Sequence, residues 1–123
     1  MPFVTVNWLA TRTREEKQIL VHGIGEAFEK SGTPAEYIHV IFNDVPRSNW
    51  GEGGTAELPF VTVNWWATRT QEEKKILVRG IADAFSKAGT PAGNVHIIVN
   101  DVPKSNWAEG GELASEKYPN RRV

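Results

Sequence analysis

Alternating apolar and polar residues near the start of the chain predict a β-strand. Val4, Val6 and Trp8 share one side of an extended backbone, and Thr5 and Asn7 lie on the other. A period of two, with β-branched and aromatic residues, is typical of a strand that buries one face.

An amphipathic helix is predicted directly after this strand. Thr13 and Glu16 have the spacing of a capping box, in which a hydroxyl and a carboxylate bind amides that the first helical turn leaves unpaired. Apolar residues then recur at helical spacing, at Leu20, Ile24, Ala27 and Phe28. The turn formers at 32–34, Gly-Thr-Pro, end the predicted helix.

A second, mostly apolar strand is predicted over residues 37–43. Strand, helix and strand form a β-α-β unit, whose crossover normally leaves the two strands parallel with the helix on one face. The next residues, 44–54, are rich in turn formers and are predicted to form a hairpin or loop that carries Trp50.

The whole pattern occurs twice. Residues 2–58 align with residues 59–115 without a gap, and 38 of the 57 aligned pairs are identical. We therefore predict two repeats, 1–57 and 58–123, joined by a short and taut connection. The predicted fold is α+β, with two tandem β-α-β units that form a mixed four-stranded sheet with two helices on one face. A unit of this size buries too little surface alone, so we expect the copies to pack on each other and on further chains.

Composition narrows the classes of function. A hydrophobic content of 40% and five Trp indicate a folded globular protein. The net charge of −1, with Arg121 and Arg122 as the one basic pair that stands out, gives no footprint for nucleic acid. The sequence has no long apolar run and no signal-peptide pattern, so we expect no membrane span and a cytoplasmic location. Without cysteine, the chain has no disulfide, thiolate metal site or cysteine nucleophile.

Pro2 is the first candidate for chemistry, because removal of Met1 would leave its ring nitrogen as a free secondary amine. An ordinary α-amino group titrates near pH ~7.7 to 8.0, so the pKa of the more basic prolyl amine must fall before it can act as a base at neutral pH. Burial and nearby cations would lower it. Pro59, the counterpart of Pro2, is acylated by Leu58, so its nitrogen cannot accept a proton.

Several motifs together resemble one family. They are the segment Pro2-Phe3-Val4-Thr5-Val6, then Arg12 before the capped helix, Asn43-Asp44-Val45-Pro46, Trp50, Gly53-Gly54 and the C-terminal stretch 110–115. This set resembles the 4-oxalocrotonate tautomerase family of the tautomerase superfamily, and the resemblance covers both halves of the chain. It implies short β-α-β subunits that assemble as hexamers, or, for fused pairs such as this one, as homotrimers.

The resemblance also implies roles for individual residues. Pro2 would be the catalytic base, Arg12 would bind a substrate carboxylate, and Trp50 would form the aromatic wall beside the proline. A guanidinium suits bidentate capture of a carboxylate. Other interpretations remain open at this point: Arg12 could pair with Glu15 or Glu16, and Trp50 could simply fill the core.

His39 and His96 depart from the family pattern, which places an arginine there to polarise the substrate carbonyl. A histidine supplies a weaker, pH-dependent cation or a neutral donor, and the alternative is a hydrogen-bonded histidine on a strand. Three histidines without a carboxylate cluster do not make a metal site, so we expect neither metal nor cofactor.

The sequence therefore predicts a tautomerase that catalyses enol–keto proton transfer on small 2-hydroxydienoates or enol-pyruvates. The second repeat would complete the oligomer and lend Arg69, His96 or Trp107 to a site, so that each chain has one competent proline. Two alternatives stay open. A hydratase or dehalogenase of the same superfamily would need a water-activating carboxylate such as Asp44 or Glu52, and retention of Met1 would leave a non-catalytic assembly or binding protein.

Overall fold

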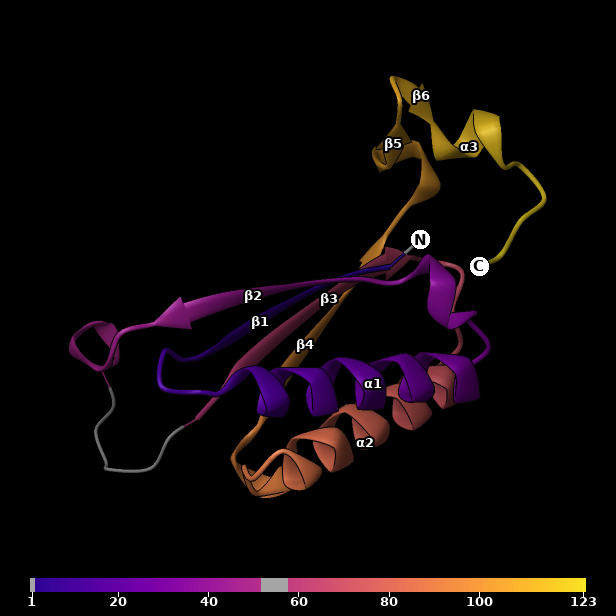
Figure 1. Cartoon of the computed structure of the whole chain (residues 1–123). Coiled ribbons are helices and arrows are strands. Elements are labelled where there is room, and N and C mark those ends of the chain that lie inside the picture. Colours follow the sequence, from indigo (N-terminus) through magenta and orange to yellow (C-terminus); the bar gives the residue numbers. More distant parts are fainter. Residues whose placement is uncertain (1, 52–57) are drawn as a thin grey trace.

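The computed structural model of the chain describes residues 2–51 and 58–123, which form two similar halves (Figure 1). The first half contains β1 (Phe3–Leu9), α1 (Arg14–Lys30) and β2 (His39–Val45). The second contains β3 (Phe60–Trp66), α2 (Gln71–Lys87) and β4 (His96–Val102). Short 3₁₀ turns at 35–37, 47–49, 92–94 and 104–106 connect these elements. A small hairpin of β5 (Ala108–Glu109) and β6 (Glu112–Leu113) follows, and then α3 (Ala114–Lys117).

The helices begin where their sequence signals predict. The amide of Glu16 donates to Thr13 Oγ1 at 3.1 Å, and the amide of Thr13 donates to the Glu16 carboxylate at 2.7 Å, which confirms the capping box. Thr70 and Glu73 repeat this arrangement at the start of α2. Just beyond the end of α1, Gly32 has φ +102°, a conformation that suits glycine because it has no Cβ.

The second strand of each half begins later than the sequence predicts. Residues 35–37 form a 3₁₀ turn, closed by a hydrogen bond from the Tyr37 amide to the Pro34 carbonyl at 3.0 Å. The extended backbone of β2 therefore starts at His39, and the strand continues to Val45. Turn formation after Pro34 accounts for this shift of two residues.

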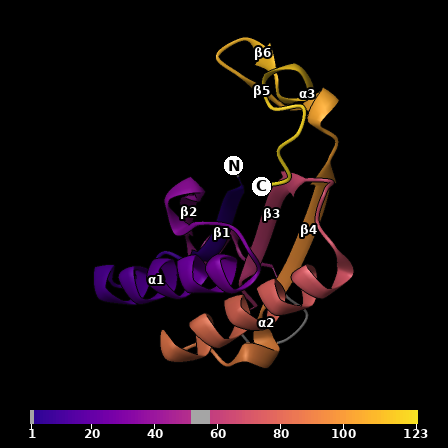
Figure 2. The ribbon, with the colours of Figure 1, turned by 90° about the vertical axis from the view of Figure 1, so that its right-hand side faces the viewer.

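The four long strands form one mixed sheet in the order β2-β1-β3-β4. β1 and β2 are parallel, as are β3 and β4, whereas the two central strands β1 and β3 are antiparallel. Both long helices cover the same face of this sheet (Figure 2). The predicted mixed four-stranded sheet with two helices on one face is thus confirmed.

The two halves share a single core. Phe28 on α1 packs edge-on against Trp65 of β3, with ring centroids 5.9 Å apart, and Phe85 on α2 packs against Trp8 of β1 at 5.2 Å. All four side chains are buried. Each helix therefore covers the strand of the other repeat, which explains why one half alone would lack a closed core.

The helices approach each other closely at glycine. A Cβ at Gly23 would collide with Ala84, and one at Gly80 would collide with Ala27. The small residues at this crossing let the backbones of α1 and α2 come together over the sheet.

The opposite face of the sheet carries exposed apolar residues. Phe3, Ile41, Phe60 and Ile98 are 42%, 55%, 37% and 46% exposed. Among the described residues, no helix lies over this face (Figure 2). Polar residues lie between these apolar side chains, since Thr5 and Thr62 separate Ile41 from Ile98 in the register of the sheet. Four large apolar side chains exposed on one face suit a surface that is covered in an assembly.

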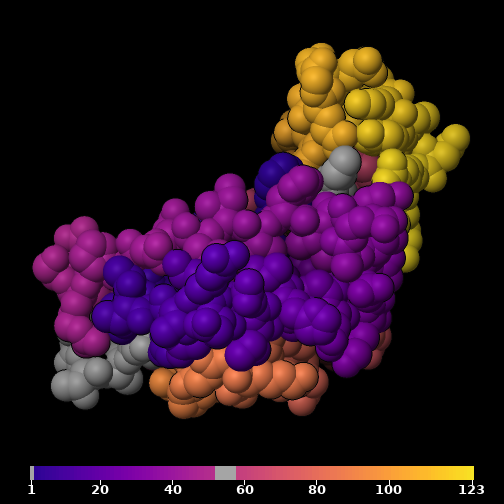
Figure 3. Space-filling view, in the orientation of Figure 1, coloured from indigo at the N-terminus to yellow at the C-terminus, as the bar shows by residue number. Residues whose placement is uncertain are grey.

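The last part of the chain forms a lobe that stands above the end of the sheet. Space-filling spheres show this lobe, from about residue 104 to residue 123, beside the main body (Figure 3). Both ribbon views place the start of β1 and the end of the chain at this same end of the sheet (Figures 1 and 2). Within residues 2–51 and 58–123, no helix has the length and apolar content required to cross a membrane.

Candidate active site

The antiparallel pairing of β1 and β3 decides which residues surround Pro2. Phe3 pairs with Asn64, and continuing this register by one residue places Pro2 opposite Trp65. β3 ends there and leads to Arg69. The same register places Pro59 opposite Trp8 at the other end of the sheet. Each proline therefore adjoins the strand end of the other repeat.

Pro2 is buried and lines a small cavity. The other lining residues come from three parts of the chain: Thr33, Trp65, Trp66, Arg69, Arg122 and Val123. The volume of about 10 Å³ is about the minimum that a single water needs. The carbonyl of Pro2 accepts a hydrogen bond from the His39 amide at 3.1 Å, which fixes the start of β1 against β2.

Arg69 is a fixed cation in this cavity. Its side chain is 3% exposed, and its guanidinium lies 4.6 Å from the ring centroid of Trp65. It donates to the hydroxyl of Thr33 and the carbonyl of Ser31, and it pairs with Glu73 at 3.1 Å. A buried cation held in this way persists because its donors are satisfied.

Glu73 links Arg69 to the end of the chain. Arg122 binds the Glu73 carboxylate with both terminal nitrogens, at 2.7 and 2.9 Å. The hydrogen bond from Arg122 makes the largest contribution to a pKa of Glu73 well below its ordinary value, and bonds from Arg69 and the Thr70 amide lower it further, against the effect of burial. Glu73 is therefore ionised at every pH near neutrality.

The segment 118–123 is fastened over the Pro2 cavity by further contacts. The Thr68 hydroxyl donates to the Arg122 carbonyl, and Arg122 donates to the Thr68 carbonyl at 3.3 Å. Lys104 donates to the carbonyls of Tyr118, at 2.6 Å, and Arg121. The lobe is thereby held against the end of β3 that faces Pro2.

Arg12 lies at the opposite end of β1. It donates to Thr90 at 2.8 Å, pairs with Glu16 at 2.9 Å and lies 4.9 Å from the ring centroid of Trp8. A seven-residue strand is roughly 20 Å long, so Pro2 and Arg12 are separated by the length of β1. The arginines that line the Pro2 cavity in the same chain are Arg69 and Arg122, and the expected pairing of Pro2 with Arg12 is not made within one chain.

The remaining predicted residues divide in the same way. The ring of His39 stacks on Phe3 at 4.8 Å, and Trp107 lies 5.9 Å from Phe3, so both are at the Pro2 end. The His96 amide donates to the Pro59 carbonyl at 3.0 Å. Trp50 follows β2, whose last residue pairs with the last residue of β1, and so it lies at the Pro59 end. In one chain the aromatic residue at the Pro2 end is thus Trp107 rather than Trp50.

Sequence reasoning missed five residues that line the Pro2 cavity: Thr33, Trp65, Trp66, Arg122 and Val123. Trp66 carried a signal that could have revealed it. Residues 2–13 and 59–70 differ at one position, where the first repeat has Leu9 and the second has Trp66. A tryptophan in one copy alone indicates that the two copies have different surroundings at that point.

Of the two carboxylates considered for water activation, the one that the structure describes, Asp44, lies away from Pro2. Asp44 lies at the far end of β2 and pairs with Lys17 at 2.7 Å. Glu52 lies outside the described residues, as do Met1, Gly53, Gly54 and the expected connection at 55–57. In the part of the chain that is described, no group of three or more potential metal ligands comes together.

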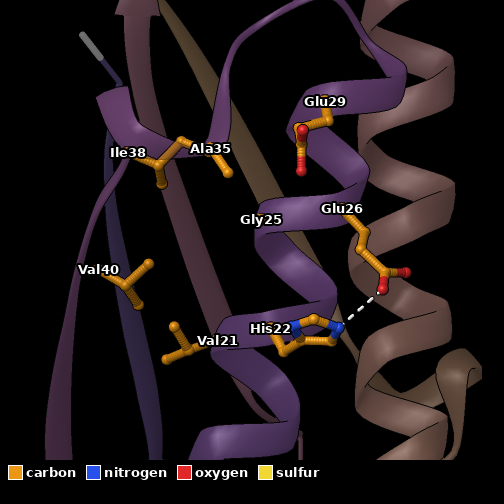
Figure 4. A pocket seen from close by; sticks show the side chains of 8 residues that line it. All are labelled: Val21, His22, Gly25, Glu26, Glu29, Ala35, Ile38 and Val40. Carbon is orange, nitrogen blue, oxygen red and sulfur yellow. Dashed lines mark ion pairs between the residues drawn. The ribbon is translucent and has the colours of Figure 1, made fainter.

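A larger groove lies along α1, away from Pro2 (Figure 4). It has a volume of about 200 Å³ and includes an ion pair between His22 and Glu26 at 2.8 Å. A similar groove runs beside Arg79 and Asp83, the corresponding residues of α2. None of the predicted site residues lines either groove, so both follow from the repeated packing of helix on sheet.

Comparisons with known proteins match both repeats to one family. Residues 2–56 and 59–117 each match the family described as "Tautomerase enzyme". A probable tautomerase of Lactococcus lactis is 38% identical over 61 residues, which is 49% of this chain and 100% of that protein. A probable tautomerase of Lactiplantibacillus plantarum is also 38% identical over 61 residues, covering 49% of this chain and 95% of the relative.

Solved structures of similar length include fused proteins. "F6 fused 4-OT wild type asymmetric trimer" has a TM-score of 0.87 and 25% identity, over 94% of this chain and 98% of that one. "Q0 fused 4-OT wild type symmetric trimer" has a TM-score of 0.85 and 23% identity, over 97% and 99%. A malonate semialdehyde decarboxylase, FG41, shares the fold at 17% identity with a TM-score of 0.79, over 98% of both chains.

Proposed function

Because the chain belongs to the tautomerase family, as a fused two-repeat member of the 4-oxalocrotonate tautomerase kind, we propose that Pro2 is the base of this isomerase and acts on small enol carboxylates. The observation that carries the proposal is the placement of the buried Pro2 in a small cavity beside the buried cation Arg69. Pro59 has the same fold around it, but its nitrogen is part of the peptide bond from Leu58.

The surroundings of Pro2 suit a neutral amine. Once Met1 is removed, its nitrogen would be buried among aromatic rings, and burial penalises the protonated form. Arg69 and Arg122 line the same cavity and would lower the pKa of the amine further. A pKa near the working pH makes a general base most effective.

The reaction follows from this arrangement. The neutral Pro2 nitrogen takes the proton of the enol hydroxyl, so that the O–H bond breaks and negative charge spreads over the oxygen and the reacting carbon. A guanidinium stabilises this charge. The protonated nitrogen then returns the proton to carbon, which forms the C–H bond of the keto product and restores the neutral amine.

In the same chain, Arg69 is the buried cation beside Pro2 that would stabilise the negative charge of the intermediate. Arg12, Trp50 and His96 lie at the opposite end of the sheet, so they can serve a Pro2 site only if another copy of the chain brings them there. His39 and Trp107 lie beside Phe3 and are candidates to contact the substrate next to Pro2.

A trimer would supply such a neighbour. The exposed face of the sheet, with Phe3, Ile41, Phe60 and Ile98, offers an apolar surface that further copies can cover. Two of the similar fused structures are trimers, one asymmetric and one symmetric. We propose a homotrimer with one competent proline in each chain.

Turnover of phenylenolpyruvate and 2-hydroxymuconate, combined with intact-mass measurement, tests the proposal. The mass should show loss of Met1, and Pro2→Ala should abolish most of the turnover. Retention of Met1 would instead indicate an assembly or binding protein without catalysis. Wild-type turnover in Pro2→Ala would contradict the assignment of Pro2 as the base.

A further inference from the structure

The segment 118–123 closes the Pro2 end of the sheet and has no counterpart at the other end. Residues 59–115 align with the first repeat, and the chain that follows them has no copy there. Arg122 and Val123 line the Pro2 cavity, whereas the first repeat passes directly into the second. The second repeat, whose strand β3 ends beside Pro2, is therefore followed by a segment that forms an additional wall of the Pro2 cavity.

The two guanidiniums in this wall differ in their freedom to bind a ligand. Arg69 is 3% exposed at its side chain and is held by Thr33, Ser31 and Glu73. Arg122 is 52% exposed, and the two acceptors of its guanidinium are Glu73 and the carbonyl of Thr68. Because about half of the Arg122 side chain is exposed, a second carboxylate can reach its guanidinium from solvent and replace Glu73 there.

Glu73 would keep its own partners after such an exchange. Arg69 binds its carboxylate at 3.1 Å, and the Thr70 amide donates to it at 2.8 Å. No buried charge would be left unpaired, which is the usual penalty for breaking a pair of this kind.

The cavity must gain volume before a substrate enters, through the loss of Met1 from Pro2 and through movement of one wall. At about 10 Å³ it can hold no molecule larger than water. The strands and Arg69 belong to the buried core, whereas 118–123 is attached by hydrogen bonds, by the Arg122–Glu73 ion pair and by the ring of Tyr118, which lies 5.7 Å from that of Trp66. This segment is the wall that can open.

We propose that Arg122 is a substrate-binding residue of the Pro2 site. It leaves Glu73 to bind the carboxylate of the incoming substrate, and the segment 118–123 opens and recloses with it. This inference rests on the proposed function of Pro2, because it supplies the carboxylate contact that Arg12 cannot make in the same chain.

The same residues define a class of substrate. Two guanidiniums and one carboxylate, Arg69, Arg122 and Glu73, leave one net positive charge, which matches a single substrate carboxylate. Trp65 and Trp66 provide aromatic walls. The site therefore suits a monocarboxylate with a flat apolar substituent better than a dicarboxylate.

Binding of an unreactive probe tests the role of Arg122 without turnover. We would compare 3-phenylpropanoate with its neutral amide, 3-phenylpropanamide, by calorimetry. The wild-type protein should bind the acid at least about tenfold more tightly than the amide, as expected for a charge-assisted contact. Arg122→Ala should remove most of this preference, because it weakens binding of the acid and leaves binding of the amide unchanged. Arg122→Lys should restore part of the preference.

Arg79→Ala is the matched control. Arg79 is exposed on α2, so this substitution removes the same charge at a position away from the cavity. It should keep the wild-type preference for the acid. Equal affinity for acid and amide in the wild type, or an unchanged preference in Arg122→Ala, would overturn the inference.

The same variants separate this inference from the proposed function. If turnover depends on Pro2 while Arg122→Ala keeps its preference for the acid, the Arg122 inference fails and the proposed function stands. If Pro2→Ala turns over normally while Arg122→Ala loses the preference, the proposed function fails and Arg122 is still a carboxylate-binding residue.

Discussion

The two ends of the sheet are made from nearly identical segments and differ in what closes them. At one end Pro59 lies opposite Trp8, near Leu9 and Arg12; at the other Pro2 lies opposite Trp65, near Trp66 and Arg69. The Arg12 side chain is 16% exposed and that of Arg69 is 3% exposed. Trp66 in place of Leu9, together with the segment 118–123, has thus made the Pro2 end more enclosed than the Pro59 end.

This difference indicates that, in the fused chain, both repeats contribute equally to the fold but only one of them can supply the catalytic proline. Phe28 and Phe85, and the two capping boxes, perform the same structural task in both halves. Only the first proline can become a free amine, so of the two prolines only Pro2 can act as a base. The second repeat is then free to keep its proline for the fold alone.

The largest expected contrast is between the two prolines. Pro2→Ala should lower kcat for phenylenolpyruvate by about 10²- to 10⁴-fold, the usual contribution of a positioned general base. Pro59→Ala should leave kcat within about twofold if catalysis needs no proline at that end. Steady-state kinetics on both variants checks this, and an equal loss in the two would remove the distinction between the ends.

The core should show no such contrast. Phe28→Ala and Phe85→Ala each remove a fully buried ring and should each lower the free energy of unfolding by about 3 to 5 kcal/mol. Urea denaturation measures both. A loss confined to one variant would show that the halves do not share one core equally.

The smallest expected contrast concerns the two capping glutamates and pH. The pKa of Glu73 is lowered chiefly by Arg122, whereas that of Glu16 is lowered chiefly by the Thr13 amide. Since both pKa values are depressed in the folded state, the stabilisation is fully present above about pH 4.5, the ordinary carboxyl value, and is lost as the pH falls below it.

Glu73→Gln should therefore cost more stability at pH 7 than Glu16→Gln, by about 1 kcal/mol, and the gap should narrow on acidification. Thermal unfolding from pH 7 to pH 3 follows the two variants. In the Arg122→Ala background, the difference in stability between the two glutamate variants should shrink at pH 7 as well. A difference that does not depend on Arg122 would contradict the role assigned to its hydrogen bonds with Glu73.

Local signals made much of the fold predictable. The alternation around Val4 and Val6 and the Thr13–Glu16 spacing depend on neighbours within one turn or strand, so the sequence reveals them directly. Arg12 shows the limit of such local signals, because the sequence left open whether it binds a substrate or pairs with a glutamate. Its surroundings depend on how β1 pairs with β3, and that pairing joins residues from different repeats.

The segment 118–123, which forms one wall of the Pro2 cavity, could not be predicted from local patterns either, because its contacts join residues far apart in the sequence. Arg122 appeared in the sequence as half of a short basic pair, and its contact with Glu73 spans 49 positions. The substitution of Leu9 by Trp66 between the repeats was visible, but its meaning requires knowing that Trp66 faces Pro2. Residues whose roles arise from long-range packing need the structure.

Titration of the proline nitrogen by NMR, with ¹⁵N-labelled proline, tests the central claim most directly. The account predicts one titrating proline nitrogen in each chain, that of Pro2, with a pKa below that of an ordinary prolyl amine and close to neutrality. A Pro2 nitrogen that stays fully protonated well above pH 8, or the absence of any titrating proline nitrogen, would contradict it.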